Sequence, residues 1–277
     1  MSVRLGTVAP VGFQEFPPAP WLGCMRELGC AAVQVYRNQA AAVSRREIRD
    51  AIAAGGMPCD SVHGIFGEQF DPSSPLEQAR RFAVDAYRAE GELAAEIGGP
   101  LVVVHCSTIR REGVSPQERL IRLAQLRKSI LDLGFFGNDI GVRYAFENLP
   151  AYHPVGSDMA ELAGLLRQSN APSAGICLDS GHANMIGDPA QAVAQADGQI
   201  IYVHLNDNSG GADEHLMPTY GRVDMVALGR ALHRAGYDGT LMLEVFYSLE
   251  DLRRLIGEGC AGRLRRIVDA ANGANVE

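Results

Sequence analysis

Eight short runs of β-branched and aliphatic residues alternate with longer stretches of helical spacing along the whole chain. The runs cover residues 3–8, 31–36, 59–65, 101–106, 142–147, 174–179, 200–205 and 239–246. Strands that alternate with helices build parallel βαβ units. Because one α/β barrel typically takes roughly 250 residues, we expect a single domain over residues 1–277.

The stretches between these runs carry helix signals. The longest reaches from residue 74 to residue 97, and its apolar spacing predicts one buried face. That face would contain Leu76, Ala79, Phe82, Ala83, Ala86, Leu93 and Ile97. Ser115 precedes Glu118 with capping-box spacing, and Ser157 precedes Glu161, so helices should begin near both serines.

Four of the runs carry a carboxylate or an imidazole at or near their end, and turn residues follow each run. The four residues are Glu147, Asp179, His204 and Glu244. The carboxyl ends of parallel barrel strands meet at one rim, where such side chains converge. Three carboxylates and one imidazole form an oxygen-rich ligand set for a divalent cation. The pattern therefore predicts a metal-dependent enzyme.

An open doubly wound sheet has the same alternation of strands and helices. Such a sheet collects its site at one switch point, whereas here the last four runs all contribute. Two earlier runs also carry a histidine near their end, His63 and His105. We therefore predict an α/β fold of the (β/α)8 TIM-barrel type, with its site at the carboxyl-terminal face of the strands.

Five ordered segments resemble the successive motifs of the sugar phosphate isomerase/epimerase family, which belongs to the xylose isomerase-like barrels. The segments are residues 146–150, 177–183, 203–208, 213–216 and 243–246. The resemblance implies that Glu147, Asp179, His204 and Glu244 hold one divalent ion, either manganese, magnesium, cobalt or zinc. It also implies that Glu147 and Glu244 are the catalytic acid/base pair.

The resemblance further implies a set of substrate contacts. We expect these from His63, His105, His182, Asp213, His215 and Arg222. Ketohexose epimerases tend to carry an arginine shortly after the equivalent of His204, but residues 209–212 here are Ser-Gly-Gly-Ala. Arg222 is the candidate to replace that arginine. His153 and His233 lie in loop or helix contexts and are expected at the surface.

The expected reaction is proton transfer next to a carbonyl. A metal-bound enediolate would form when one glutamate removes a proton, and the other glutamate would return it. Proton return to the opposite face inverts a stereocentre, while return to the adjacent atom moves the carbonyl. The substrate would be a sugar, a keto-polyol or a sugar phosphate, since no glycine-rich phosphate-binding loop decides between them.

Several alternatives remain open. A single acid after a strand is often the N-cap of the next helix. The chain also contains, by type and order, the nine ligands of trinuclear-zinc endonucleases that cut DNA at abasic sites. They are His63, His105, Glu147, Asp179, His182, His204, Asp213, His215 and Glu244. The same residues leave room for a second ion in a small-molecule enzyme. The protein could also be a keto-polyol dehydratase or an inactive barrel that only binds its ligand.

Charge and cysteine content limit the partners and the location. The net charge of −8 disfavours tight binding to nucleic acid, which depends on cationic contacts to phosphates. The six cysteines contain no CxxC pair and suit buried, reduced thiols in a cytoplasmic protein. No apolar stretch approaches the ~18 residues of a membrane span. A homo-oligomer remains open.

Overall fold

The computed structural model describes residues 2–111 and 113–276. Its strands form a closed parallel barrel in chain order. They are β1 (Arg4–Val11), β2 (Cys30–Arg37), β3 (Cys59–His63), β4 (Leu101–His105), β5 (Arg143–Glu147), β6 (Ala174–Asp179), β7 (Ile200–Leu205) and β8 (Thr240–Leu243). The barrel closes where β1 pairs with β8, with Arg4 opposite Thr240. The predicted (β/α)8 TIM barrel is confirmed.

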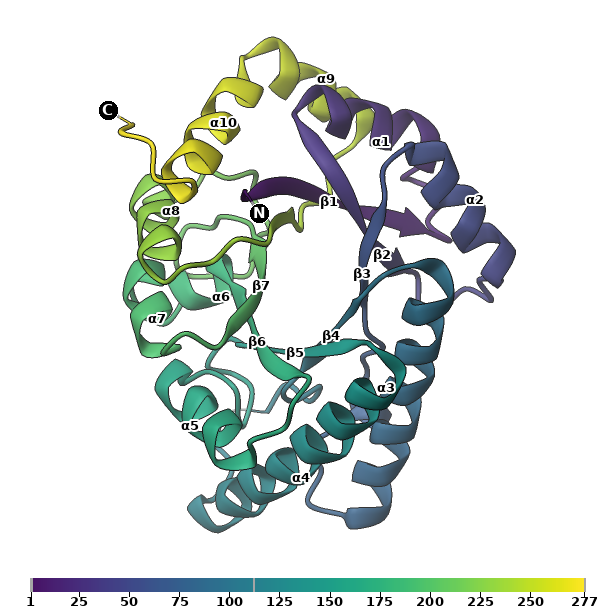
Figure 1. Ribbon diagram of the computed structural model, residues 1–277, viewed down its shortest axis with the longest axis vertical. Helices are drawn as coiled ribbons and strands as arrows, with labels where there is room; N and C mark the ends of the chain where they lie inside the picture. Colours follow the sequence, from purple (N-terminus) through teal and green to yellow (C-terminus); the bar gives the residue numbers. More distant parts are fainter. Residues whose placement is uncertain (1, 112, 277) are drawn as a thin grey trace.

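Helices surround the barrel and cover the outer face of the strands (Figure 1). They are α1 (Pro18–Glu27), α2 (Arg45–Gly55), the 3-10 helix η1 (Glu68–Phe70), α3 (Glu77–Ile97), α4 (Pro116–Ile140), α5 (Met159–Ser169), α6 (Ser180–Asn184), α7 (Pro189–Gln195), α8 (Met225–Arg234), α9 (Leu249–Gly257) and α10 (Cys260–Ala271). The main hydrophobic core lies between these helices and the barrel, and includes Val102, Phe146 and Leu178.

A second, smaller core fills the barrel itself. It consists of Leu101, Val103, Ala145, Cys177, Tyr202 and Met242. Successive side chains of a strand point to opposite faces, so every second residue of these strands faces inward. The residue two positions after each of these core residues therefore also points into the barrel, closer to the carboxyl-terminal rim.

Some predicted boundaries and one predicted face differ from the structure. The helix expected from residue 74 begins at Glu77, and the last strand ends at Leu243 rather than at residue 246. The cap before α5 is Asp158, whose carboxylate accepts a hydrogen bond from the Glu161 amide. Ser115 does cap α4, as its hydroxyl accepts from the Glu118 amide.

The predicted buried face of α3 is partly wrong. Leu76 and Phe82 are exposed, while Arg80 and Glu90 are buried. Both charged residues are buried and pair with residues of opposite charge, Arg80 with Asp132 and Glu90 with Arg37, so hydrophobicity alone assigns the wrong face.

The cysteines agree with one further expectation. All six cysteines are free thiols and are buried. Within the described ranges, every helix is either too short or too polar to pass through a lipid bilayer.

Candidate metal centre

The predicted ligands lie at the carboxyl-terminal rim because each continues an inward-facing row of its strand. Glu147 ends β5, Asp179 ends β6, His204 is the penultimate residue of β7, and Glu244 follows β8 directly. Each lies two positions after a residue of the interior core, namely Ala145, Cys177, Tyr202 or Met242. Strand register also places Asp179 beside His204. Period-two alternation and barrel closure together direct all four side chains into the mouth.

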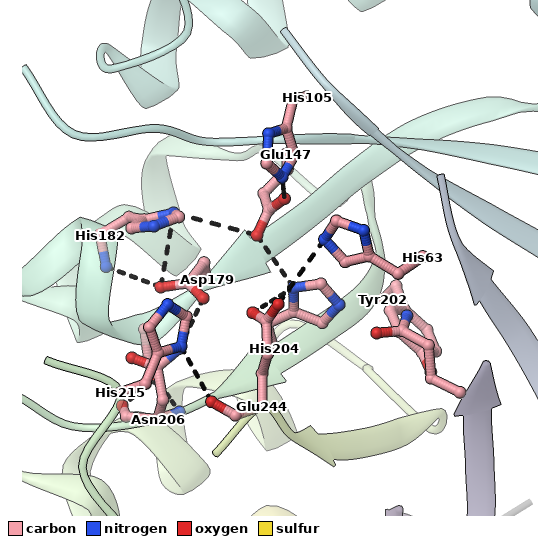
Figure 2. Close-up of polar contacts among 12 residues, drawn as sticks. His63, His105, Glu147, Asp179, His182, Tyr202, His204, Asn206, His215 and Glu244 are labelled. Carbon is pink, nitrogen blue, oxygen red and sulfur yellow. Dashed lines mark hydrogen bonds and ion pairs between the residues drawn. The ribbon is translucent and has the colours of Figure 1, made fainter. Parts of the chain in front are cut away.

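These four residues form one compact group. Their candidate ligand atoms all lie within 4.8 Å of one another, and none of the four residues is more than 4% exposed. The Nδ1 atom of His204 is 2.9 Å from Glu147 Oε1 and 3.0 Å from Glu244 Oε2. Figure 2 shows Glu147 and Glu244 approaching His204 from two sides.

The electrostatics of this group favour a bound cation. Burial raises the pKa of Asp179, and the nearby carboxylates of Glu147 and Glu244 raise it further, although His182 opposes them. Burial would also raise the pKa of Glu147, but His204 and His105 hold it well below its usual value. Three buried carboxylates this close repel one another, and a divalent ion would relieve that repulsion. The donor set therefore fits such an ion.

Hydrogen bonds orient Asp179 from behind. Asn206 donates from Nδ2 to Asp179 Oδ2 at 2.6 Å, and the Asp179 amide donates to Asn148 Oδ1 at 2.7 Å. Gly181 packs so closely that a Cβ there would lie 1.9 Å from Asn206 Oδ1. Outer contacts of this kind fix the direction of a ligand and tune its affinity.

Besides a group in which Cys177 joins Glu147 and His204, two further groups of donors flank the first. His63, His105 and Glu147 form one group, with His105 Nε2 3.1 Å from Glu147 Oε2. His182, Asp213 and His215 form the other, and Asp213 lies 3.3 Å from each of the two imidazoles. The nine residues that the sequence singles out are therefore all at this rim, in three adjoining groups.

A cavity of about 200 Å³ opens directly above these groups. Its walls are Tyr36, His63, Phe66, Gly67, His105, Thr108, Arg110, Glu147, Leu149, Tyr152, His153, His182, Asp213, His215 and Glu244. Five of the six predicted substrate contacts line it. Arg222 does not, and it is exposed in the loop before α8.

The sequence reasoning missed several cavity residues. His153 was expected at the surface but lines the cavity, and Arg110, Tyr36 and Tyr152 also face it. Arg110 and His153 lie in the loops after β4 and β5, and such loops build the active sites of barrels. That position was the available signal, because no residue spacing marks these side chains.

Asp207, three residues after His204, has a structural task. Its carboxylate accepts hydrogen bonds from the backbone amides of Thr219, Gly221 and Val223. The polar stretch after β7 therefore holds the loop before α8 in place. His204 itself belongs to the four-residue group at the rim, which could hold an ion, and not to this turn.

A family model described as the xylose isomerase-like TIM barrel matches residues 24–267. The chain belongs to the xylose isomerase-like TIM-barrel family. The predicted relationship to these barrels is confirmed, and the matched range includes every residue of the three donor groups.

Two curated relatives match this xylose isomerase-like chain over only part of their own length. An uncharacterised protein of Methanocaldococcus jannaschii is 30% identical over 195 residues, which make up 66% of this chain and 63% of that protein. The 3-dehydroshikimate dehydratase of Pseudomonas putida is 27% identical over 196 residues, 66% of this chain and 30% of that protein. The chain thus spans less than two thirds of the length of either relative.

Solved structures with the same barrel cover nearly the whole chain. A D-tagatose 3-epimerase-like protein superposes with a TM-score of 0.80 at 22% identity, over 98% of both chains. The 3-keto-D-glucoside 4-epimerase of E. coli superposes with a TM-score of 0.77 at 20% identity, over 95% of this chain and 99% of that one. At this identity the likeness shows a common fold.

Proposed function

We propose that this protein is a divalent-metal-dependent isomerase or epimerase of a small carbohydrate. The observation that carries the proposal is the placement of Glu147 and Glu244. Both carboxylates line one cavity, and both lie within 3.0 Å of the same nitrogen of His204. Two carboxylates that face a common point from different strands can serve two faces of one substrate carbon.

The residues that would hold the ion are Glu147, Asp179, His204 and Glu244. Their oxygen-rich composition suits manganese, magnesium, cobalt or zinc. A divalent ion bound there would act as a Lewis acid for the negative charge that develops on a substrate oxygen.

The two glutamates perform the proton transfer. The neighbouring His204 keeps the pKa of both carboxyl groups below the ordinary value, in spite of their burial. Both side chains are therefore ionised, which is the form that accepts a proton from the carbon next to a carbonyl. One glutamate takes that proton and releases it to solvent, and the other takes up a proton from solvent and delivers it to the opposite face or to the adjacent carbon.

The size of the cavity and the known relatives support a small substrate. At about 200 Å³ the cavity is smaller than the roughly 300–1,000 Å³ of typical ligand pockets. The two structural neighbours are, by their names, a D-tagatose 3-epimerase-like protein and a 3-keto-D-glucoside 4-epimerase. The similarity to 3-dehydroshikimate dehydratase leaves dehydration of a keto-polyol as a variant that begins with the same proton removal.

The test combines metal analysis with solvent-deuterium exchange on a panel of ketoses, aldoses and inososes. The purified protein should hold about one divalent ion, and Glu147→Gln or Glu244→Gln should abolish deuterium uptake at a sugar carbon. General acid/base catalysis is worth roughly 10²–10⁴-fold, so the loss should be at least of that order.

A control must separate lost metal from lost proton transfer. Asp179→Asn removes a ligand but neither proton-transfer group, so saturating manganese should restore part of its exchange. The two glutamine variants should stay inactive at the same manganese concentration. Exchange that persists in both would remove the glutamates from the reaction.

A second candidate function is cleavage of DNA at abasic sites. It is favoured by one observation, the division of nine donor residues into three adjoining groups, which gives room for more than one ion. The net charge of −8 and the small cavity argue against it. Incubation with an abasic-site duplex at low salt, under full metal loading, decides: cleavage would support the nuclease, and an intact duplex would dismiss it.

A further inference from the structure

One side of the cavity carries a positive charge that the proton-transfer chemistry does not use. Arg110, in the loop between β4 and α4, is the only lysine or arginine among the described residues that line the cavity. No carboxylate of the described residues forms an ion pair with it. Elsewhere the cavity wall holds the acids Glu147, Asp213 and Glu244. The cavity is thus acidic over the metal group and basic at Arg110.

Two contacts hold this loop against the loop after β5. The guanidinium of Arg110 lies over the ring of Tyr152, with 5.1 Å from Cζ to the ring centroid. The backbone amide of Arg111 donates to the carbonyl oxygen of Tyr152 at 2.9 Å. A stacked guanidinium keeps its N–H groups free in its plane, where they can bind an oxyanion in a bidentate manner.

Unpartnered polar atoms lie on the same side of the cavity. Thr108 Oγ1 and His153 Nδ1 are buried and have no hydrogen-bond partner among the described residues, and both residues line the cavity. Buried polar atoms nearly always have a partner. Two such atoms lie beside an arginine that pairs with no carboxylate of residues 2–111 and 113–276, which indicates that a ligand completes this wall.

We propose that Arg110, assisted by Thr108 and His153, binds an anionic group of the substrate, either a phosphate or a carboxylate. This inference rests on the proposed isomerase or epimerase function, and it narrows the substrate to sugar phosphates or sugar acids. The group of Glu147, Asp179, His204 and Glu244 binds the carbonyl end of such a substrate through its ion. Arg110 binds the anionic group. Free, uncharged ketoses leave the Arg110 side without a partner.

The test compares Arg110→Met with Arg111→Met. The control arginine is adjacent in sequence, pairs with Glu118 at 3.5 Å and does not line the cavity. Deuterium exchange is measured on ketose phosphates, on keto sugar acids and on their uncharged counterparts. For the anionic class that the enzyme uses, Arg110→Met should raise KM roughly 10- to 100-fold with little change in kcat, as expected for a lost charge-assisted contact.

The two anionic panels distinguish phosphate from carboxylate, and Arg110→Lys should recover part of the affinity. Arg111→Met should leave all values unchanged. An equal effect of Arg110→Met on charged and uncharged substrates would overturn the inference, while the proposed reaction would stand.

A binding measurement keeps the inference testable if no sugar exchanges deuterium. Inorganic phosphate and acetate are titrated into metal-free protein by calorimetry. At least one should bind the wild type and Arg111→Met equally, and bind Arg110→Met at least tenfold more weakly. Equal binding of both anions to all three proteins would refute an anion site at Arg110, whatever the reaction is.

Discussion

At the scale of single residues, the surroundings of each histidine decide its role. His63 and His153 both line the cavity, and burial lowers the pKa of each to about 4. His63 also faces Glu244, with 3.6 Å between Nε2 and Oε1. His153 lacks such a carboxylate partner in the described part of the chain. Burial is therefore the main influence on the pKa of His153.

This difference predicts a pH dependence of stability. The pKa of His153 is about 4 in the folded protein against an ordinary 6.5, so protonation favours the unfolded chain. Burial of the neutral His153 imidazole therefore costs no unfolding free energy above pH 6.5, and the unfolding free energy falls as the pH drops from 6.5 toward 4. His153→Gln should therefore reduce the acid sensitivity of the urea midpoint in that window, measured with a chelator present.

The matched control is His233→Gln, since His233 is exposed on α8. It should follow the wild-type pH curve. If His153→Gln follows that curve as well, the imidazole does not titrate as its burial indicates.

At the scale of elements, ion pairs with one buried member on α3 join this helix to its neighbours. Arg80 of α3 reaches Asp132 of α4 at 2.7 Å, and Glu90 of α3 pairs with Arg37 at the end of β2. These pairs explain why α3 buries charge where apolar spacing alone predicts Leu76 and Phe82. Contacts between distant segments determined the orientation of the helix.

The pair of Arg122 and Asp71 allows a stability prediction. Arg122 of α4 lies 2.8 Å from Asp71 in the loop before α3, and both side chains are about 95% buried. Arg122→Met would leave the Asp71 carboxylate buried without its partner, which should cost roughly 3–5 kcal/mol of unfolding free energy. Urea denaturation measures the change.

The control for this prediction is Arg46→Met. Arg46 pairs with Asp50 on the exposed side of α2, and such surface pairs contribute little to stability. Its urea midpoint should barely move. A similar midpoint for Arg122→Met would mean that water or another group replaces the lost partner.

At the scale of the whole molecule, the donor groups depend on closure of the barrel. The four candidate ligands come from the ends of β5, β6, β7 and β8, and the closed sheet holds these strands in register. An ion bound to all four would connect half of the barrel at one rim. It would bind the folded chain but find no assembled site in the unfolded chain.

Removal of metal should therefore lower thermal stability. With free manganese at 100 times its dissociation constant, linkage predicts about 2.7 kcal/mol of added stability. Calorimetry of the protein with EDTA and with manganese measures this difference. Asp179→Asn should lose most of the manganese effect at the same concentration, because one of the four ligands is gone. An equal effect of manganese in both proteins would place the ion elsewhere.

Local pattern in the chain was enough to predict the strands, the barrel and the rim at which Glu147, Asp179, His204 and Glu244 meet. The reason is that inward alternation along a strand repeats every two residues, so a polar residue after a core run has a defined direction. The same rule placed His63 and His105.

Other features depend on segments that are distant in sequence. Arg110 and His153 became cavity residues because two loops pack against each other, which no spacing encodes. Arg222 lies outside the cavity, in a loop whose backbone amides Asp207 holds. The buried face of α3 depended on ion pairs with β2 and α4. In each case the deciding energy comes from a contact between distant residues, and only the folded chain brings them together.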